Sequence, residues 1–109
     1  MTDYSFGEIL LLRFPYSEGV GEARRPAVVL AQTDIEDIVV SKVTSVEQRG
    51  KYDIVIEDWQ RAGLILPSVV RIDKLATLSK SRVIRRLGQL HNSYHPMLKA
   101  NLKELFNIE

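Results

Sequence analysis

An unbroken apolar run directly after two arginines and a proline constrains this chain most. Residues 24–26 are Arg-Arg-Pro, and residues 27–31 are Ala-Val-Val-Leu-Ala. A continuous aliphatic run of this length is typical of a strand that is buried on both faces. The proline restricts the backbone between the cations and the apolar residues. We therefore predict a strand over residues 24–32 that holds Arg24 and Arg25 at its mouth, where they can bind an anion.

The length and composition predict one globular domain, which we assign to residues 1–109. The chain has no cysteine, which excludes disulfides, zinc–thiolate sites and thiol nucleophiles and agrees with a reducing compartment. No basic segment precedes an apolar run at the N-terminus, and no apolar stretch is long enough to cross a bilayer. We expect a cytoplasmic protein without a membrane partner.

Basic residues are concentrated in the second half of the chain. Asp73 is the only acid between Arg71 and Lys103, although this interval contains several lysines and arginines. Such a bias is typical of a surface that meets a polyanion or an acidic partner. Solubilising charge around a sheet remains the alternative.

Further apolar runs predict short strands and one helix. We expect strands over residues 8–14, 38–45, 52–56 and 69–73, the last with a continuation or bend through 74–78. Residues 82–87 could be a strand or a helical turn, and we favour a strand. Residues 57–63 predict one helical turn closed by a glycine. After Pro96, apolar residues recur at helical spacing and predict a C-terminal helix that docks on the sheet or on a second subunit: Leu98, Leu102, Leu105 and Phe106. The pattern indicates a small, mainly antiparallel β-barrel-like domain.

The residues exclude several kinds of site. No Gly-x-Ser-x-Gly elbow and no phosphate-binding glycine loop occur. His91 and His95 lie four residues apart and could share a helix face as metal ligands, but no convincing third ligand is nearby. We therefore expect no metal and no other cofactor.

Arginines, hydroxyls and carboxylates remain, and this set suits phosphate chemistry. RNA carries its own nucleophile in the 2′-hydroxyl, so a protein that cleaves it must stabilise phosphate charge and remove a proton. Arg25 offers bidentate donors, and Thr44 offers a hydroxyl near the end of a strand. An arginine before a strand can equally be structural or merely solvated, so these residues alone leave the function open.

Several short segments, in this order and spacing, resemble the MazF/PemK-like toxins of bacterial type II toxin–antitoxin systems over nearly the whole chain. The matching segments are Gly7-Glu8-Ile9, Arg24-Arg25-Pro26 with its apolar run, Val43-Thr44-Ser45, Ala62-Gly63-Leu64, residues 67–75 and Leu87-Gly88-Gln89-Leu90. The resemblance implies an SH3-like β-barrel with a short helix and a C-terminal amphipathic helix. It also implies a homodimer and an antitoxin partner whose acidic segment covers a cationic groove.

The same resemblance implies metal-independent cleavage of single-stranded RNA, such as mRNA, at short motifs. The products would carry a 2′,3′-cyclic phosphate and a 5′-hydroxyl. The family's catalytic arginine falls on Arg25 and its hydroxyl residue on Thr44. Arg71 and Asp73 match an arginine and an aspartate that take part in some members.

Roles for these residues follow from their chemistry. We assign Arg25 to charge stabilisation in the transition state. Asp73 is assigned as general base, because a carboxylate accepts a proton and an arginine is a poor base. Arg71 and Asp73 are two apart on a strand and share a face, so a salt bridge of Asp73 with Arg71 or a nearby lysine is the structural alternative.

Further residues are expected to contact RNA. These are Arg24, Tyr16, Ser45 and Gln48, of which Tyr16 could stack on a base or pack at the loop edge. We interpret Trp59 as a core residue. Glu18 and Glu22 put negative charge into the first loop, where many family members carry a Gln-Gly-rich stretch.

These departures leave a second hypothesis open. The chain could be a catalytically inactive or gyrase-poison-like interaction protein on the same fold. Such a protein would bind an antitoxin or nucleic acid without cleaving RNA.

Overall fold

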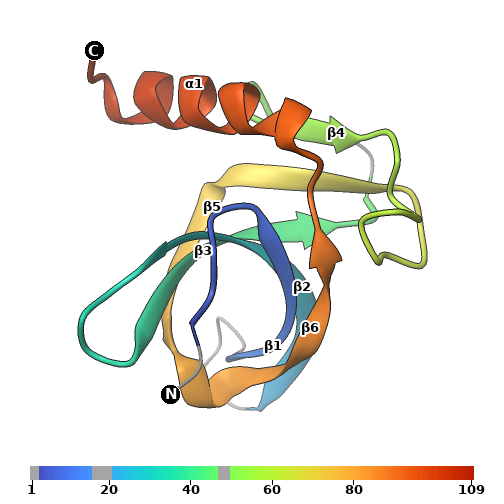
Figure 1. Cartoon of the computed structure of the whole chain (residues 1–109), viewed down its shortest axis with the longest axis vertical. Coiled ribbons are helices and arrows are strands. Elements are labelled where there is room, and N and C mark those ends of the chain that lie inside the picture. Colours follow the sequence, from blue (N-terminus) through green and yellow to red (C-terminus); the bar gives the residue numbers. More distant parts are fainter. Residues whose placement is uncertain (1–2, 16–20, 47–49) are drawn as a thin grey trace.

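Six antiparallel strands form one curled sheet in the computed structural model, which describes residues 3–15, 21–46 and 50–109. The strands lie in the order β4-β5-β3-β2-β1-β6, and α1 lies across one end of the curl, near β4 and β5 (Figure 1). The expected antiparallel barrel-like fold with a C-terminal helix is confirmed. The elements are β1 (Glu8–Pro15), β2 (Glu22–Gln32), β3 (Asp37–Thr44), β4 (Ile54–Ile56), β5 (Ser68–Ser79), η1 (Lys80–Arg82), β6 (Val83–Gln89), η2 (Asn92–Tyr94) and α1 (His95–Phe106).

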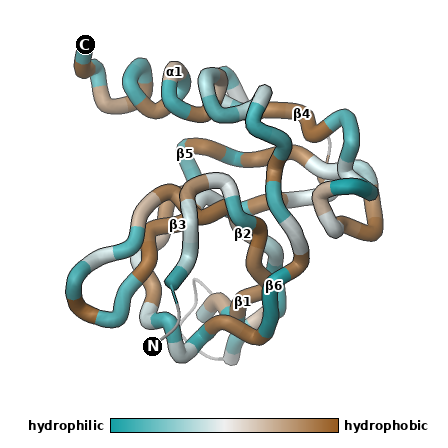
Figure 2. Tube along the Cα trace, in the orientation of Figure 1, coloured by the Kyte–Doolittle hydropathy of each residue, from teal (hydrophilic) through white to brown (hydrophobic). Residues whose placement is uncertain are grey.

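Buried side chains form two clusters, one on each face of the sheet. The inner cluster lies within the curl and contains Leu10, Leu12, Phe14, Ala27, Val29, Ile38 and Val40. The helix-side cluster lies under α1 and β4 and contains Ile9, Val28, Val43, Ile54, Ile56, Ala62, Leu64, Val70, Ile72, Leu90, Tyr94 and Leu98. Figure 2 shows apolar residues along the strands and a mainly hydrophilic turn between β2 and β3.

Strand β2 contributes to both clusters. Ala27 and Val29 enter the inner cluster, Val28 enters the helix-side cluster, and all three are fully buried. Burial on both faces is therefore confirmed for these residues. It is wrong for Leu30, which is half-buried, and for Ala31, which is exposed, where the pairing of β2 with β3 shifts register.

Strand β5 bends sharply and serves both clusters in turn. Ser41 of β3 pairs with Leu75, whereas the next residue, Lys42, pairs with Arg71, so three residues of β5 form the bend. The buried Ser41 hydroxyl donates a 3.0 Å hydrogen bond to the backbone oxygen of Ile72, which satisfies a carbonyl in the irregular segment. The expected continuation of this strand is confirmed, and Figure 1 shows its corner.

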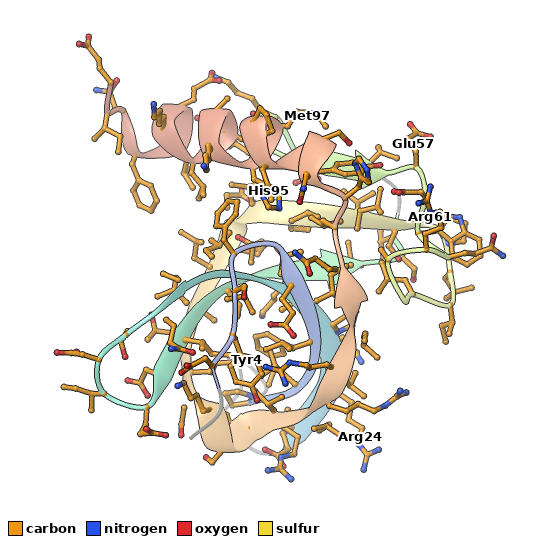
Figure 3. All side chains as sticks on the ribbon, in the orientation of Figure 1. Tyr4, Arg24, Glu57, Arg61, His95 and Met97 are labelled. Carbon is orange, nitrogen blue, oxygen red and sulfur yellow. The ribbon has the colours of Figure 1, made fainter. Side chains whose placement is uncertain are left out.

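Helix α1 docks on the sheet through part of its apolar stripe. Leu98 is fully buried, and Leu102 and Leu105 pack against the helix-side cluster. Phe106, the last residue of the stripe and of the helix, is 56% exposed and does not dock on the sheet, which leaves the expected contact with a second subunit as the alternative for this residue. Figure 3 shows His95 on the sheet side of α1 and Met97 on the opposite side. Within the described residues, no helix is long and apolar enough to cross a membrane.

Two glycines hold the turn at residues 57–63 against β6. This segment contains one helical turn, with the Ala62 N–H donating to the Asp58 carbonyl, and it continues as turns instead of a regular helix. Gly63 closes it at a φ of +90°. A Cβ on Gly63 would lie 1.9 Å from the Leu87 oxygen, and one on Gly88 would lie 2.2 Å from the Ala62 oxygen. Only glycine allows this approach of the two backbones.

We predict that Gly63→Ala lowers the free energy of unfolding by about 2 kcal/mol or more, because it combines backbone strain with a clash against β6. Urea unfolding followed by circular dichroism measures the change. Gln60→Ala, an exposed position in the same turn, is the control and should change stability by no more than about 0.5 kcal/mol. Equal effects of the two variants would contradict the proposed contact.

Candidate functional site

A pocket of about 640 Å³ lies beside the ends of β2 and β3. The pairing of these strands ends at Ala27 and Lys42, and continuing the register by two residues places Arg25 opposite Thr44. Both residues line the pocket, together with Arg24 and Ser45. The structure thus brings four of the predicted site residues to one place: Arg24, Arg25, Thr44 and Ser45.

The Thr44 hydroxyl is oriented by the backbone that follows β3. Its oxygen accepts a 3.1 Å hydrogen bond from the N–H of Val46. This bond occupies a lone pair of the oxygen and leaves the hydroxyl hydrogen available to donate. Thr44 can therefore donate to an anionic oxygen in the pocket.

Arg24 and Arg25 present cationic groups at the pocket. Both are exposed, and Nη1 of Arg25 donates a 2.8 Å hydrogen bond to the Arg24 carbonyl. This contact uses a single guanidinium hydrogen, so the remaining donors can bind a ligand. Neither arginine forms an ion pair with any residue that the structure describes. Figure 3 shows Arg24 at the periphery of the curled sheet.

A third arginine, Arg85 of β6, lines the same pocket and was not predicted as a site residue. It lies opposite Leu11 of β1, which is also a pocket residue. It has no ion-pair partner within residues 3–15, 21–46 and 50–109. Arg85 reaches the pocket because β6 pairs with β1, and no local sequence pattern predicts this pairing.

Several other cations are neutralised within the chain. In three of the five ion pairs an acid from the first half of the sequence reaches an arginine in the second half, which reduces the charge bias seen in the sequence. The ion pairs are Arg13–Glu22, Arg82–Glu22, Arg86–Glu8, Arg71–Asp53 and Lys51–Glu104. The three pocket arginines have no such ion pair within the described residues, and unlike the other unpaired cations they all line one pocket.

Apolar residues also line the pocket. They come from the segment that Gly63 and Gly88 hold against β6, and include Leu64, Ile65 and Leu66. Ile65 is 88% exposed and Leu66 is 52% exposed. A pocket lined by both cations and exposed apolar side chains suits a ligand that carries both phosphates and planar bases.

Arg71 and Asp73 do not line this pocket. Nε of Arg71 lies 3.1 Å from Oδ1 of Asp53, a carboxylate whose side chain is fully buried. Asp53 also accepts a 2.9 Å hydrogen bond from the N–H of Gly50. Arg71 thus pairs with Asp53, while Asp73 is exposed in the bend of β5.

The remaining predicted residues fall elsewhere. Tyr16 and Gln48 lie outside the described residues. Trp59 is half-buried and packs against the helix-side cluster. It also lines a second pocket of about 540 Å³ that shares Ser45 and Val46 with the first.

The two histidines make contacts within the chain. Nδ1 of His91 accepts a 3.1 Å hydrogen bond from the N–H of Ser93. The His95 ring packs edge-on against Phe6, with 5.1 Å between ring centres. Among the described residues, no group of three or more histidine, cysteine or acidic side chains could hold a metal ion.

The chain matches one protein family and is similar to several solved structures. Residues 5–106 match the family described as the PemK-like, MazF-like toxin of type II toxin-antitoxin system. No curated protein matches the chain. The Mycobacterium tuberculosis toxin MazF-mt6 is 20% identical, with a TM-score of 0.77 over 94% of this chain and 98% of that chain. MazE-MazF of Deinococcus radiodurans is also 20% identical, with a TM-score of 0.78 over 97% of this chain and 98% of that chain.

A third similar structure is an endoribonuclease from a mycobacterial species. It is 13% identical, with a TM-score of 0.77 over 99% of this chain and 95% of that chain. At these identities the solved structures establish the shared fold. The match of the sequence to the family covers nearly the whole chain.

We predict that Asp53→Asn lowers the free energy of unfolding by about 2 kcal/mol, because it removes the charge partner of Arg71. This is below the cost for a fully buried pair, since 28% of the Arg71 side chain is exposed. Glu104→Gln, in the exposed pair with Lys51, is the matched control and should cost less than about 0.5 kcal/mol. Urea unfolding measures both variants, and similar losses would show that burial of Asp53 adds nothing.

Proposed function

The chain belongs to the PemK-like, MazF-like toxins of type II toxin–antitoxin systems, and from this premise we propose that it is a metal-independent endoribonuclease. Its substrate is single-stranded RNA such as mRNA, cut at short sequence motifs. The observation that carries the proposal is the meeting of Arg25 and Thr44 in one pocket. RNA provides the nucleophile, so the chain itself needs to supply charge stabilisation and proton transfer.

The proposed reaction is an internal transfer at one phosphate. The ribose 2′-oxygen attacks the adjacent phosphorus, its proton passes to a base, and the bond from phosphorus to the 5′-oxygen breaks. The leaving 5′-oxygen takes up a proton, which yields a 2′,3′-cyclic phosphate and a 5′-hydroxyl. Arg25 stabilises the negative charge that builds up on the phosphate oxygens, and the Thr44 hydroxyl donates to one of them.

Other residues of the pocket bind the RNA strand in this proposal. Arg24 contacts a phosphate and Ser45 contacts the RNA beside Thr44, since both line the same pocket. The exposed apolar side chains of Ile65 and Leu66 pack against unstacked bases. Tyr16 and Gln48 are proposed as further contacts from the sequence alone.

Asp73 is proposed as the general base, with Arg71 beside it. Asp73 is an exposed carboxylate on β5 and does not line the pocket of a single chain. The role therefore requires the bound RNA or a second subunit to bring the 2′-hydroxyl within hydrogen-bond reach of Asp73.

We further propose that the protein is a cytoplasmic homodimer that an antitoxin inhibits. One similar structure is MazE-MazF, and another is an endoribonuclease in complex with its cognate antitoxin. The uncompensated arginines of the pocket would bind an acidic segment of such a partner. This partner would then cover Arg25.

The nuclease proposal predicts that the purified protein cuts long single-stranded RNA in excess EDTA into fragments with cyclic phosphate ends. Arg25→Ala and Thr44→Val should each lower the rate of cleavage by about 100-fold or more, because each removes a donor to the developing charge. Lys103→Ala, an exposed change on α1, should leave cleavage unchanged. Electrophoresis and end-group analysis measure the products.

Intact RNA at high concentrations of the wild-type protein would overturn the nuclease proposal. Growth arrest with broken DNA and undamaged RNA would instead favour the gyrase-poison-like alternative. Growth arrest without damage to either nucleic acid would favour an inactive interaction protein.

The base assignment predicts that Asp73→Asn lowers kcat, because an amide cannot accept the 2′-hydroxyl proton. KM should change little. Asp34→Asn, at another exposed aspartate in the β2–β3 turn, is the matched control and should leave kcat unchanged. An unchanged kcat in Asp73→Asn would show that another group accepts the proton.

A further inference from the structure

We propose that Arg85 is a further RNA-binding residue of the pocket, which contacts a backbone phosphate other than the one that is cleaved. This inference rests on the proposed function, because it takes the bound ligand to be RNA. It extends the path of the RNA from β2 across β1 to β6. Neither the sequence motifs nor the family match assigns a role to this residue.

The position of Arg85 places its charge on the far side of β1 from Arg25. Arg85 pairs with Leu11 of β1, and Arg25 pairs with Leu12 from the opposite side. The backbones of β2 and β6 are therefore two strand spacings apart, or about 10 Å. Arg25 is also tied to the carbonyl of Arg24 on its own strand. Both arginines line the same pocket, but their strands are separated by β1, so they suit different phosphates of one extended strand.

The neighbouring Arg86 shows how this fold neutralises an arginine that holds two segments together. Arg86 forms an ion pair with Glu8, donates to the Asp3 carbonyl and lies over the Tyr4 ring, with 4.7 Å from its guanidinium carbon to the ring centre. These contacts fasten the N-terminal segment to β6. In the part of the chain that the structure describes, Arg85 has no comparable acid or ring partner.

The strand that carries Arg85 is held rigidly at the pocket. Leu87, two residues further along β6, lines the pocket as well and contacts the Gly63 backbone closely. Residues two apart on a strand point to the same face, so Arg85 and Leu87 belong to one wall. Apolar side chains beside a cation lower the local dielectric and strengthen its attraction to a phosphate. The strand fixes the backbone of Arg85 at the pocket, and its exposed guanidinium can reach a phosphate there.

The test measures binding without cleavage. The probe is a fluorescent 2′-O-methyl RNA of mixed sequence, about 12 nucleotides long, which lacks the 2′-hydroxyl nucleophile. Its Kd is measured by anisotropy between about 50 and 200 mM salt. If Arg85 contacts one phosphate, Arg85→Ala weakens binding and reduces the slope of log K against log salt by about 0.7. Arg85→Lys should retain the slope, because it keeps the charge.

Two controls make the result specific. Lys103→Ala removes an exposed cation that does not line the pocket, and it should leave the slope unchanged. Circular dichroism of Arg85→Ala checks that the fold is retained. A slope that is the same in Arg85→Ala and in the wild type, with the fold intact, would overturn the inference.

Uncharged linkages in the RNA probe then identify the phosphate that Arg85 contacts. Methylphosphonates replace the probe's phosphates one position at a time, in a probe of the sequence that the enzyme cleaves. A single position outside the scissile phosphate should weaken wild-type binding and have no further effect on Arg85→Ala. If the neutral linkage at every position weakened binding by Arg85→Ala as much as binding by the wild type, the assignment of one phosphate to Arg85 would be overturned.

The inference and the proposed function can fail separately. If the wild-type protein leaves RNA intact but Arg85→Ala reduces the salt slope, the nuclease proposal is wrong and the RNA-binding role of Arg85 stands. If the wild-type protein cleaves RNA but Arg85→Ala has the same salt slope as the wild type, the proposed function stands and the inference about Arg85 is wrong.

Discussion

The burial of β2 on both faces is the constraint on which the rest of the structure depends. Ala27 and Val29 pack into the inner cluster while Val28 packs into the helix-side cluster, so β2 cannot shift along its neighbours without exposing apolar surface on both sides. The arginines that precede these residues pair with β1 and are consequently held at a fixed point of the sheet. Thr44, the last residue of β3, lines the same pocket as these arginines.

The electrostatics of the fold depend on which cations are neutralised. Glu8, Glu22 and the buried Asp53 each pair with an arginine, and these contacts secure the N-terminal segment, the start of β2 and the start of β5. Arg25 and Arg85 have no such partners in the described residues. Because both line one pocket together with Arg24, their charges add in attracting an anion to that pocket.

Local sequence patterns predicted the features that depend on neighbouring residues. The Arg-Pro-apolar pattern predicted β2 and both of its arginines, and the alternation around Thr44 predicted the end of β3. Contacts between distant strands could not be predicted in this way. The proximity of Arg85 to Arg25 depends on the pairing of β6 with β1, and the Arg71–Asp53 pair depends on the register of β4 with β5. The exposure of Phe106 depends on where α1 stops relative to the sheet.

The bend in β5 has a consequence for how the molecule unfolds. Val70 and Ile72, before or within the bend, belong to the helix-side cluster, whereas Ala76 and Leu78 after it pack against the inner cluster. One continuous strand therefore belongs to both hydrophobic clusters, and β1, β2 and β3 do as well. Neither cluster can open while the other stays intact, so the chain should lose its structure in a single cooperative transition without a stable half-folded state.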